Sequence, residues 1–590
     1  MKAELGGRGR GSGVGARTPG VRPAVRGQGS GAGGRGKPSA GTARTSWGVI
    51  GAAAALGLVL AFIVYSPALH GPFVFDDSYL PNLDEPLGNW IHGGRKLLML
   101  TYWWNANQSG GDTFSWHIFN VLIHVINSGL VYLIVRRLAP DPNRLLAGFA
   151  AGLFLLHPLQ TEAVAYLSGR SEEFSVMFAF AAYAVFLWRK QAAVSWRVAA
   201  AVMVLFGMAL LSKEQTIVLP AVLLLTDLWW SPGKTLEGAR RNWRLYLAMV
   251  VGAVAGVASF WSLITQATSA GFALKDFTWY QYFFTQCRAI WVYVAEFFFP
   301  VRLNADWDFP ISHTIVDHGA IIGLAALLTA IVLAWKYRTR FPLGCFGFFL
   351  FLLLMAPTSS VLPIQDPIAE RRVYFAIPGL LLIVVEILCR LRLTRQTLAV
   401  ACGAILLLAA GATYARARVW GDTVALWQDT VTKSPNKFRA HFHLASAYMG
   451  VQRTDAALAE YQKAAEVGRP DYGLLVDWAL ALDAAGQPEQ AVAKLRQAAA
   501  LNATAHVYSN IGMVYAKRSE WDPALQALAV AEKLDPNYGP SYINRGHIRI
   551  KQGQCQAAIP EYTRALQIDP RDSEAKRYLG IAQACAARGK

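Results

Sequence analysis

The chain has 590 residues, a formal net charge of +18 and 54% hydrophobic residues, while only 16% of its residues are charged. It is too apolar for an ordinary soluble protein and too long for a single domain. The positive charge does not indicate nucleic-acid binding, because the basic residues lie in an N-terminal tail and in short loops, where membrane proteins keep their cytoplasmic charge. The composition therefore predicts a membrane protein of several domains with no nucleic-acid partner.

The first 47 residues form a tail that is rich in Arg and Gly and almost free of aromatic residues. Such a segment cannot bury enough apolar surface to offset the loss of chain entropy, so we expect it to be disordered. No cleavage site of small residues follows the next apolar run. We therefore predict a basic cytoplasmic tail at residues 1–47 and a retained first membrane span, not a signal peptide.

Twelve apolar runs between residues 48 and 414 are candidates to cross the membrane, for which about 20 apolar residues are needed. They predict an all-α, polytopic membrane domain at 48–414. The runs are 48–68, 117–135, 145–157, 173–188, 197–212, 214–230, 244–266, 280–300, 318–335, 341–357, 372–389 and 397–414.

The Lys and Arg residues of the short loops orient the spans. With the tail in the cytoplasm, the basic loops lie on that side only if one run between residues 268 and 317 does not cross. The run 280–300 contains Arg288, Glu296 and many aromatic residues, as interfacial or re-entrant helices do. We therefore predict eleven crossings and an external C-terminus. The external loops are then 69–116, 158–172, 268–317 and 358–371, with a turn at Lys213 and Glu214.

From residue 438 the sequence repeats every 33 or 34 residues, the period of tetratricopeptide (TPR) helix pairs. We predict a TPR α-solenoid at 438–590, with four repeats and a polar capping helix, joined to the last span by a half-repeat at 415–437. Its expected partner is a polypeptide. Small residues recur where closely packed helices need them, at Ala445, Ala479, Gly512, Gly546 and Gly580, at Ala457, Ala491, Ala524 and Ala558, and at Ala464, Ala498, Ala531 and Ala565.

The six cysteines are scattered and include no CxxC pair. Cys287, Cys345, Cys389 and Cys402 lie in apolar segments and are interpreted as buried thiols, while Cys555 and Cys585 lie in the soluble part. The pattern predicts neither a zinc site nor a disulfide framework. Two adjacent acids, Asp76 and Asp77, are able to hold a divalent cation, yet no recurring ligand spacing demands one.

The predicted external loops carry a set of short motifs in a specific order. "FVFDDSYLPN" contains the acid pair, "RKLLMLTYWWNANQSGGDTFSWHIFNVLIH" and "LFLLHPLQTEAVAYLSGRSE" follow it, and "LLSKEQ", "LNADW" and "AERRVYF" come later. Over residues 50–420 and the repeats, this set resembles the transmembrane-and-TPR-containing protein O-mannosyltransferases of the GT-C glycosyltransferase class. The matching residues include Arg95, His157, Glu162, Arg170, Glu172, Lys213, Glu214, Asp306, Glu370, Arg371 and Tyr374.

The resemblance implies a membrane glycosyltransferase that moves a sugar, mannose or another hexose, from a polyprenyl-phosphate donor to hydroxyl groups of protein Ser or Thr on the external face. The chemistry needs a base for the hydroxyl proton and cations for the departing phosphate. We assign the base to the acid pair and choose Asp77 over Asp76. The expected phosphate ligands are Arg170, Lys213, Arg371 and Arg372.

Each of these residues also has a structural interpretation. The two acids can solvate a loop or cap a helix, Arg371 and Arg372 can anchor the chain at the interface, and Arg170 can pair with Glu162 or Glu172. Lys213 and Glu214 can form a salt bridge within a turn, and His157 can serve packing.

Two other functions compete with glycosyl transfer. A transporter keeps ionisable groups inside its spans, which here are nearly free of them. A TPR scaffold without catalysis needs one anchoring span and no patterned loops. We therefore favour the enzyme, placed in a bacterial inner membrane with the repeats in the periplasm or, otherwise, in the endoplasmic reticulum with the repeats in the lumen.

Overall fold

The computed structural model describes residues 47–80, 85–91, 94–139, 144–231, 235–266, 271–272 and 274–588. Within these ranges the chain consists of α-helices, short 3-10 turns and loops, and it contains no β-strand. The predicted all-α fold class is therefore confirmed. Residues 1–46 of the tail that we expect to be disordered lie outside the described residues, and Trp47 is the first residue of a helix.

Every apolar run of the membrane domain forms a helix. Among the described residues, four segments are long and apolar enough to cross a membrane by length and composition, Gly51–Ala68, Phe114–Leu138, Asp317–Lys336 and Arg395–Trp420. The eleven crossings and their orientation stay predictions. The helices are α1 (Trp47–Tyr65), α4 (Phe114–Leu138), α5 (Leu145–Leu156), α7 (Arg170–Leu187), α8 (Trp196–Leu210), α9 (Leu219–Trp230), α11 (Trp243–Gln266), α12 (Trp279–Phe298), α13 (Ala320–Lys336), α14 (Pro342–Met355), α15 (Ile377–Arg390) and α16 (Arg395–Trp420).

Shorter elements connect these helices and carry many of the motif residues. They are the helices α2 (Leu87–Trp90), α3 (Lys96–Ser109), α6 (Thr161–Ala165) and α10 (Glu237–Arg241), and the 3-10 turns η1 (Ser66–Ala68), η2 (Phe75–Tyr79), η3 (Pro158–Gln160), η4 (Leu167–Gly169), η5 (Glu214–Val218), η7 (Asp317–Gly319) and η8 (Glu370–Val373).

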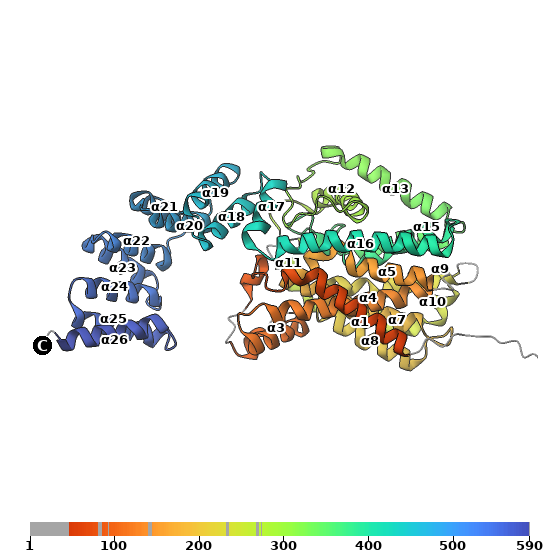
Figure 1. Ribbon diagram of the computed structural model, residues 1–590, viewed down its shortest axis with the longest axis horizontal. Helices are drawn as coiled ribbons and strands as arrows, with labels where there is room; N and C mark the ends of the chain where they lie inside the picture. Colours follow the sequence, from red (N-terminus) through yellow and green to blue (C-terminus); the bar gives the residue numbers. More distant parts are fainter. Residues whose placement is uncertain are drawn as a thin grey trace, which may run out of the picture. The chain divides into compact units, whose positions relative to one another are not determined.

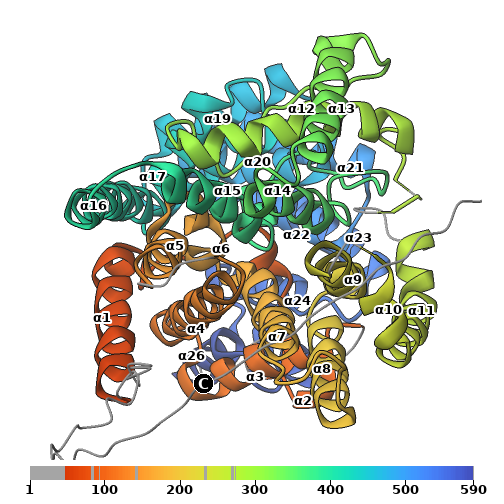
Figure 2. The same cartoon turned by 90° about the vertical axis from the view of Figure 1, so that its right-hand side faces the viewer.

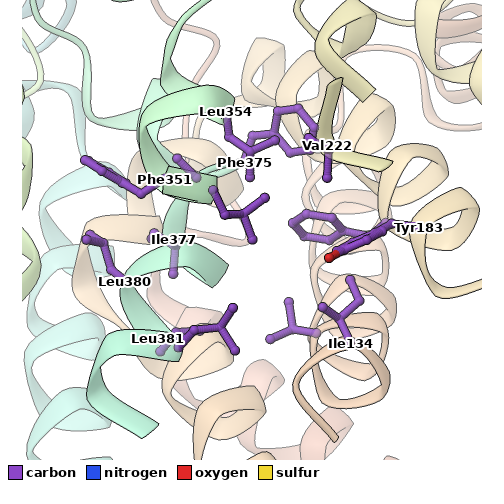
Figure 3. Packing of buried hydrophobic residues seen from close by; sticks show 14 of the residues in the cluster. Ile134, Tyr183, Val222, Phe351, Leu354, Phe375, Ile377, Leu380 and Leu381 are labelled. Carbon is purple, nitrogen blue, oxygen red and sulfur yellow. The ribbon is translucent and has the colours of Figure 1, made fainter. Parts of the chain in front are cut away.

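The centre of the membrane domain is a cluster of buried apolar side chains on α4, α5, α7, α9, α14 and α15. Figure 2 shows α4, α5 and α7 side by side, and Figure 3 shows Tyr183, Phe375 and Leu381 within the cluster. Helices surrounded by lipid associate mainly through van der Waals packing, which favours small residues at close contacts. A Cβ on Gly347 of α14 would lie 2.4 Å from the carbonyl oxygen of Gly379 in α15, so these glycines allow the two backbones to touch.

The C-terminal region is a row of antiparallel helix pairs (Figure 1). The small residues of the repeat lie where partner helices touch, because a Cβ on Gly546 would lie 2.6 Å from the ring of Tyr562. The predicted TPR fold is confirmed. Its helices are α17 (Thr423–Lys433), which packs on α18 (Phe438–Gly450), then α19 (Thr454–Val467), α20 (Tyr472–Ala484), α21 (Pro488–Leu501), α22 (Ala505–Lys517), α23 (Trp521–Leu534), α24 (Gly539–Lys551), α25 (Cys555–Ile568) and α26 (Ser573–Arg588).

The last two helices are joined by a disulfide, which the scattered cysteines did not predict. Cys555 at the start of α25 and Cys585 near the end of α26 are bonded, with their Cα atoms 5.8 Å apart. The antiparallel packing of α25 on α26 brings together residues that are 30 positions apart in sequence. The interpretation that excluded disulfides was therefore wrong for this pair. Cys287, Cys345 and Cys402 are buried, as the sequence indicated, whereas Cys389 is exposed because it lies near the end of α15, and the interpretation of Cys389 as buried was wrong.

Candidate active site

A small polar cavity of about 30 Å³ lies where three of the predicted external loops meet the first TPR helix. Predicted loop 69–116 contributes Phe75 and Asp76 to its lining. Loop 268–317 contributes Ala305 and Asp306, and α18 contributes Arg439. The remaining lining residues come from predicted loop 358–371 and are Asp366, Ile368, Ala369 and Arg371.

The two adjacent acids occupy opposite environments. Asp77 is buried, and its Oδ2 accepts a hydrogen bond from the backbone N–H of Val74 at 3.0 Å. Its Oδ1 accepts two from Ser168, from the backbone N–H at 2.9 Å and from the hydroxyl at 2.5 Å. Burial raises the pKa of the Asp77 carboxyl to about 6, and the hydrogen bonds from Ser168 and Val74 oppose this shift. Asp77 thus fastens the η2 turn to η4.

Asp76 is exposed and lines the cavity. Its backbone N–H donates to the Tyr166 hydroxyl at 2.9 Å, which fixes the residue in place. Its carboxylate forms no hydrogen bond or ion pair with any residue in the described ranges. A 3-10 turn can direct neighbouring side chains to different surroundings, and here one acid becomes a cap while the other stays available to a substrate. The geometry therefore favours Asp76 as the base, reversing the order that we chose from the sequence.

Arg371 is the cation that reaches the cavity from within the membrane domain. Its side chain is 24% exposed, and its Nη1 forms an ion pair with Oε1 of Glu162, a residue of predicted loop 158–172. The backbone N–H of Arg371 donates to the other oxygen of Glu162 at 2.9 Å. Glu162 itself is almost fully buried, so it positions Arg371 without facing the cavity.

The TPR array contributes charges to the same cavity, and sequence reasoning missed them. Arg439 of α18 contacts Asp306 through two hydrogen bonds of 2.7 Å and Asp366 through one of 3.0 Å. Lys437 lies 3.3 Å from Asp306. A signal was present, because Arg439 is the second residue of its repeat, where the other units have Gly473, His506, Pro540 and Glu574.

Arg170 is not available to a phosphate, which corrects one predicted ligand. It is fully buried, and its guanidinium donates to Asn120 Oδ1 at 2.8 Å and to Asn105 Oδ1 at 2.7 Å. A further bond of 2.9 Å reaches the carbonyl oxygen of Trp116, and the ring of Phe119 stacks at 4.5 Å. Arg170 therefore joins α3, α4 and α7 through amide oxygens, and not through Glu162 or Glu172 as its structural interpretation assumed.

Lys213 and Arg95 belong to a separate ionic cluster. Lys213 pairs with the buried Glu172 and donates to the Ser171 hydroxyl at 3.2 Å. Arg95 pairs with Glu214 at 2.6 Å, and both of these side chains are 39% exposed. Lys213 is thus bound to Glu172 rather than to its neighbour Glu214, because the η5 turn separates their side chains. None of these residues lines the cavity.

The other predicted residues are structural supports. Arg372 is buried and donates to the carbonyl oxygen of Pro367 at 3.1 Å, so it does not reach a phosphate in the cavity. His157 contacts Phe297 in two ways. Its Nε2 lies 2.9 Å from the carbonyl oxygen of Phe297, and its ring stacks on the phenyl ring of the same residue. Tyr374 bonds His124 and Asn127, each at 2.9 Å.

Glu370 is buried next to the cavity wall, where its Oε1 accepts a hydrogen bond from the backbone N–H of Asn304. Burial raises the pKa of its carboxyl, with the nearby charge of Arg416 acting in the opposite direction. Glu370 therefore ties the loop at Asn304 to the loop at Arg371. In the described part of the chain, no group of three or more His, Cys, Asp or Glu residues is placed to hold a metal ion.

Comparison with known proteins confirms the resemblance that the motifs indicated. The family described as dolichyl-phosphate-mannose-protein mannosyltransferase matches residues 104–262, and tetratricopeptide repeat families match residues 438–467, 476–539 and 543–588. The chain thus combines a segment of the mannosyltransferase type with TPR repeats. The mannosyltransferase match includes Arg170 and Lys213 but neither Asp76 nor Arg371.

Three curated relatives support the same combination. Protein O-mannosyl-transferase F38B6.6 of Caenorhabditis elegans is 22% identical over 65% of this chain and 58% of its own length. Protein O-mannosyl-transferase Tmtc1 of Drosophila melanogaster is 34% identical over 21% of this chain and 17% of its own length. The human protein TMTC1 is 26% identical over 70% of this chain and 54% of its own length. The chain therefore spans less than two thirds of each relative.

Proposed function

We propose that the protein is a membrane glycosyltransferase that moves mannose or another hexose from a polyprenyl-phosphate donor to Ser or Thr hydroxyls of proteins. The observation that carries the proposal is the cavity that is lined both by Asp76, whose carboxylate has no ion-pair partner among the described residues, and by Arg371, whose side chain is partly exposed. The family match and the mannosyltransferase names of the relatives support the sugar and the acceptor class.

In the proposed reaction the acceptor hydroxyl oxygen bonds to the anomeric carbon of the sugar while the bond from that carbon to the phosphate oxygen breaks. Asp76 takes the hydroxyl proton as general base. Arg371, positioned by Glu162, binds the phosphate whose negative charge grows as it leaves. Asp77 holds the turn that presents Asp76. The proposal assigns no step to a divalent cation.

We also propose that the cavity and the repeats lie outside the cytoplasm. All four predicted external loops contribute to the site, three through the cavity lining and the fourth through Glu162 and Tyr166. The Cys555–Cys585 disulfide is independent support, because disulfides persist in oxidising compartments such as the periplasm or the endoplasmic reticulum lumen. If a non-permeant thiol reagent labels these cysteines only after the membrane is broken and the protein is reduced, this orientation is wrong.

Asp76→Asn is the test of the catalytic assignment. The amide keeps the shape of the side chain but cannot take a proton, so transfer to an acceptor peptide should fall by about 10²–10⁴-fold. Protein level and binding of the donor should stay at the parental values. Asp308→Asn is the matched control, since Asp308 is an exposed acid in one of the same loops that does not line the cavity.

Parental transfer rates in Asp76→Asn would refute the assignment of the base. The two competing functions give different results in the same membranes. A transporter would move a solute without consuming donor, and a scaffold would retain its partners and its full function in the Asn variant.

A further inference from the structure

A second hollow begins on the other side of Phe75. It has a volume of about 470 Å³ and lies between residues 73–78, the start of α17 and one face of α18. That face carries Ser446, Ala447 and Gly450. We refer to this hollow as the α17–α18 groove. Neither the predicted motifs nor the proposed catalytic residues account for it.

Phe75 is the wall that the groove shares with the catalytic cavity. Its φ of 49° lies in the left-handed region, which a residue with a large side chain rarely adopts. The surrounding rings hold it there, with Trp427 at 4.7 Å and Tyr166 at 5.7 Å between ring centroids. Strain of this kind persists where the surrounding structure fixes it and is frequent at functional sites. Because Phe75 directly precedes Asp76, a polypeptide that lies in the groove passes one residue away from Asp76.

Apart from Asp422, the described lining of the groove consists of uncharged residues, and it combines the aromatic rings of Phe73, Phe75 and Trp427 with small residues of α18. Trp427 and His443 stack with their centroids 4.5 Å apart. Burial and, to a smaller extent, the nearby Arg439 lower the pKa of His443 to about 4 against the opposing charge of Asp306, so this ring is uncharged at neutral pH. The one carboxylate in the lining, Asp422, accepts a hydrogen bond from the backbone N–H of Ala425 as a helix cap.

These features fit one kind of occupant. A lipid phosphate needs cations, and the lining of the groove contains no Lys or Arg. An extended polypeptide needs a narrow path with flat rings and small side chains against which its backbone can lie, and Ser, Thr and Pro segments carry no charge. The groove also joins the first TPR helix, which belongs to a fold that commonly binds polypeptides.

We propose that the α17–α18 groove binds an extended, uncharged segment of the acceptor polypeptide and delivers its Ser or Thr hydroxyl past Phe75 to Asp76. This inference rests on the proposed function and adds the acceptor-binding site to it. It assigns the recognition of the acceptor to the junction between α17, α18 and the η2 turn. The rest of the TPR array is not needed for this contact.

Gly450→Leu tests the groove by filling it. A Cβ at Gly450 meets no atom within 4 Å, so the fold accommodates the larger side chain while the groove narrows. Leu is also a better helix former than Gly. The KM for a Ser- and Thr-rich acceptor peptide should rise about tenfold or more, which corresponds to about 1.4 kcal/mol, while the KM for the donor stays unchanged. Gly580→Leu in α26 is the matched control, since its Cβ is equally unobstructed.

An unchanged acceptor KM in Gly450→Leu would overturn the proposal, and so would an equal rise in Gly580→Leu. A thermal midpoint at the parental value shows that the variant is folded. If both variants lose their fold, the cross-linking below decides the question without them.

Photo-cross-linking tests the occupant without requiring turnover. A benzophenone side chain replaces Val451, which lines the groove and is 54% exposed, or Leu501, which is 60% exposed on α21. With the full-length protein in lipid nanodiscs and no donor, a biotinylated Ser- and Thr-rich peptide should cross-link at Val451 well above its yield at Leu501. Equal yields, or adducts with lipid in place of peptide, would overturn the proposal. The result remains readable if Asp76→Asn proves fully active, so failure of the groove and failure of the catalytic assignment are distinguishable.

Discussion

Arg170 and Arg371 carry the same charge and the same predicted task, yet they lie in two different polar regions. Arg170 is fully buried and all of its strong hydrogen bonds go to neutral oxygens of Asn105, Asn120 and Trp116. Arg371 has one carboxylate partner, Glu162, and keeps part of its guanidinium at the cavity. The difference shows that an arginine of a motif can bind a substrate only where its contacts within the protein leave part of its guanidinium accessible. Arg170 joins helices, while Arg371 lines the cavity and is the proposed ligand of the phosphate.

The largest expected effect is that of Arg170→Met on stability. Removing the guanidinium deprives the buried side-chain oxygens of Asn105 and Asn120 of this donor, and each loss costs about 1–3 kcal/mol. We expect little folded protein in detergent, measured by size-exclusion profile and thermal midpoint. Arg371→Met also removes the cation beside the buried Glu162, but the backbone N–H of residue 371 still donates to that carboxylate, so we expect a smaller loss of stability than in Arg170→Met. A well-folded Arg170→Met protein with a raised KM for the donor would break the comparison and return Arg170 to the phosphate site.

The second effect is that of Arg371→Ala on the donor. A charge-assisted contact to phosphate contributes about 1.5–3 kcal/mol, so kcat/KM for the donor should fall about tenfold or more. Arg371→Lys should retain part of it, because the charge remains but the bidentate geometry is lost. Arg302→Ala is the control, as Arg302 is exposed on a predicted external loop and does not line the cavity. Donor kinetics equal to those of this control would make Arg371 an anchor.

A third arginine sharpens the comparison, because Arg439 joins the repeats to the cavity through Asp306 and Asp366. We expect Arg439→Gln and Asp306→Asn to be non-additive, with a coupling free energy of about 0.5–3 kcal/mol in thermal unfolding. Hydrogen exchange at the start of α18 should speed up in each single variant. Strict additivity would show that the contact does not hold the array against the loops.

Asp76 and Asp77 allow the same comparison between a buried and an exposed carboxylate, and the pH is the variable that tests it. The pKa of Asp77 is raised from 3.8 to about 6 by burial, so the folded protein binds this proton more tightly than the unfolded chain does. Its contribution to stability is therefore complete below pH 3.8 and is lost as the pH rises through about 6. The thermal midpoint of the parental protein, relative to that of Asp77→Asn, should fall between about pH 4 and pH 6. If the thermal midpoint of the parental protein rises with pH relative to that of Asp77→Asn, this result would contradict the burial of Asp77.

Most of the fold is readable from the sequence, because it follows from patterns that repeat locally. Runs of apolar residues require helices in a membrane, where backbone groups have no water to bond. The 33- or 34-residue period of small residues requires paired helices, because only small side chains fit where the two helices touch. Residues of the four predicted external loops also meet at the cavity or beside it, as the motif order suggested, whereas the motif that contains Lys213 and Glu214 does not line it.

The tertiary structure alone decided which motif residues are free to act. Asp76 and Asp77 are neighbours of one type, and only the packing of η2 against Ser168 makes one a cap and leaves the other at the cavity. Arg439 reaches the cavity, and Cys555 bonds to Cys585, because segments that are far apart in the sequence pack against each other. A sequence pattern indicates which apolar residues a helix buries against its nearest neighbours. It does not state what meets a polar side chain across the fold, because that depends on the placement of every helix between them.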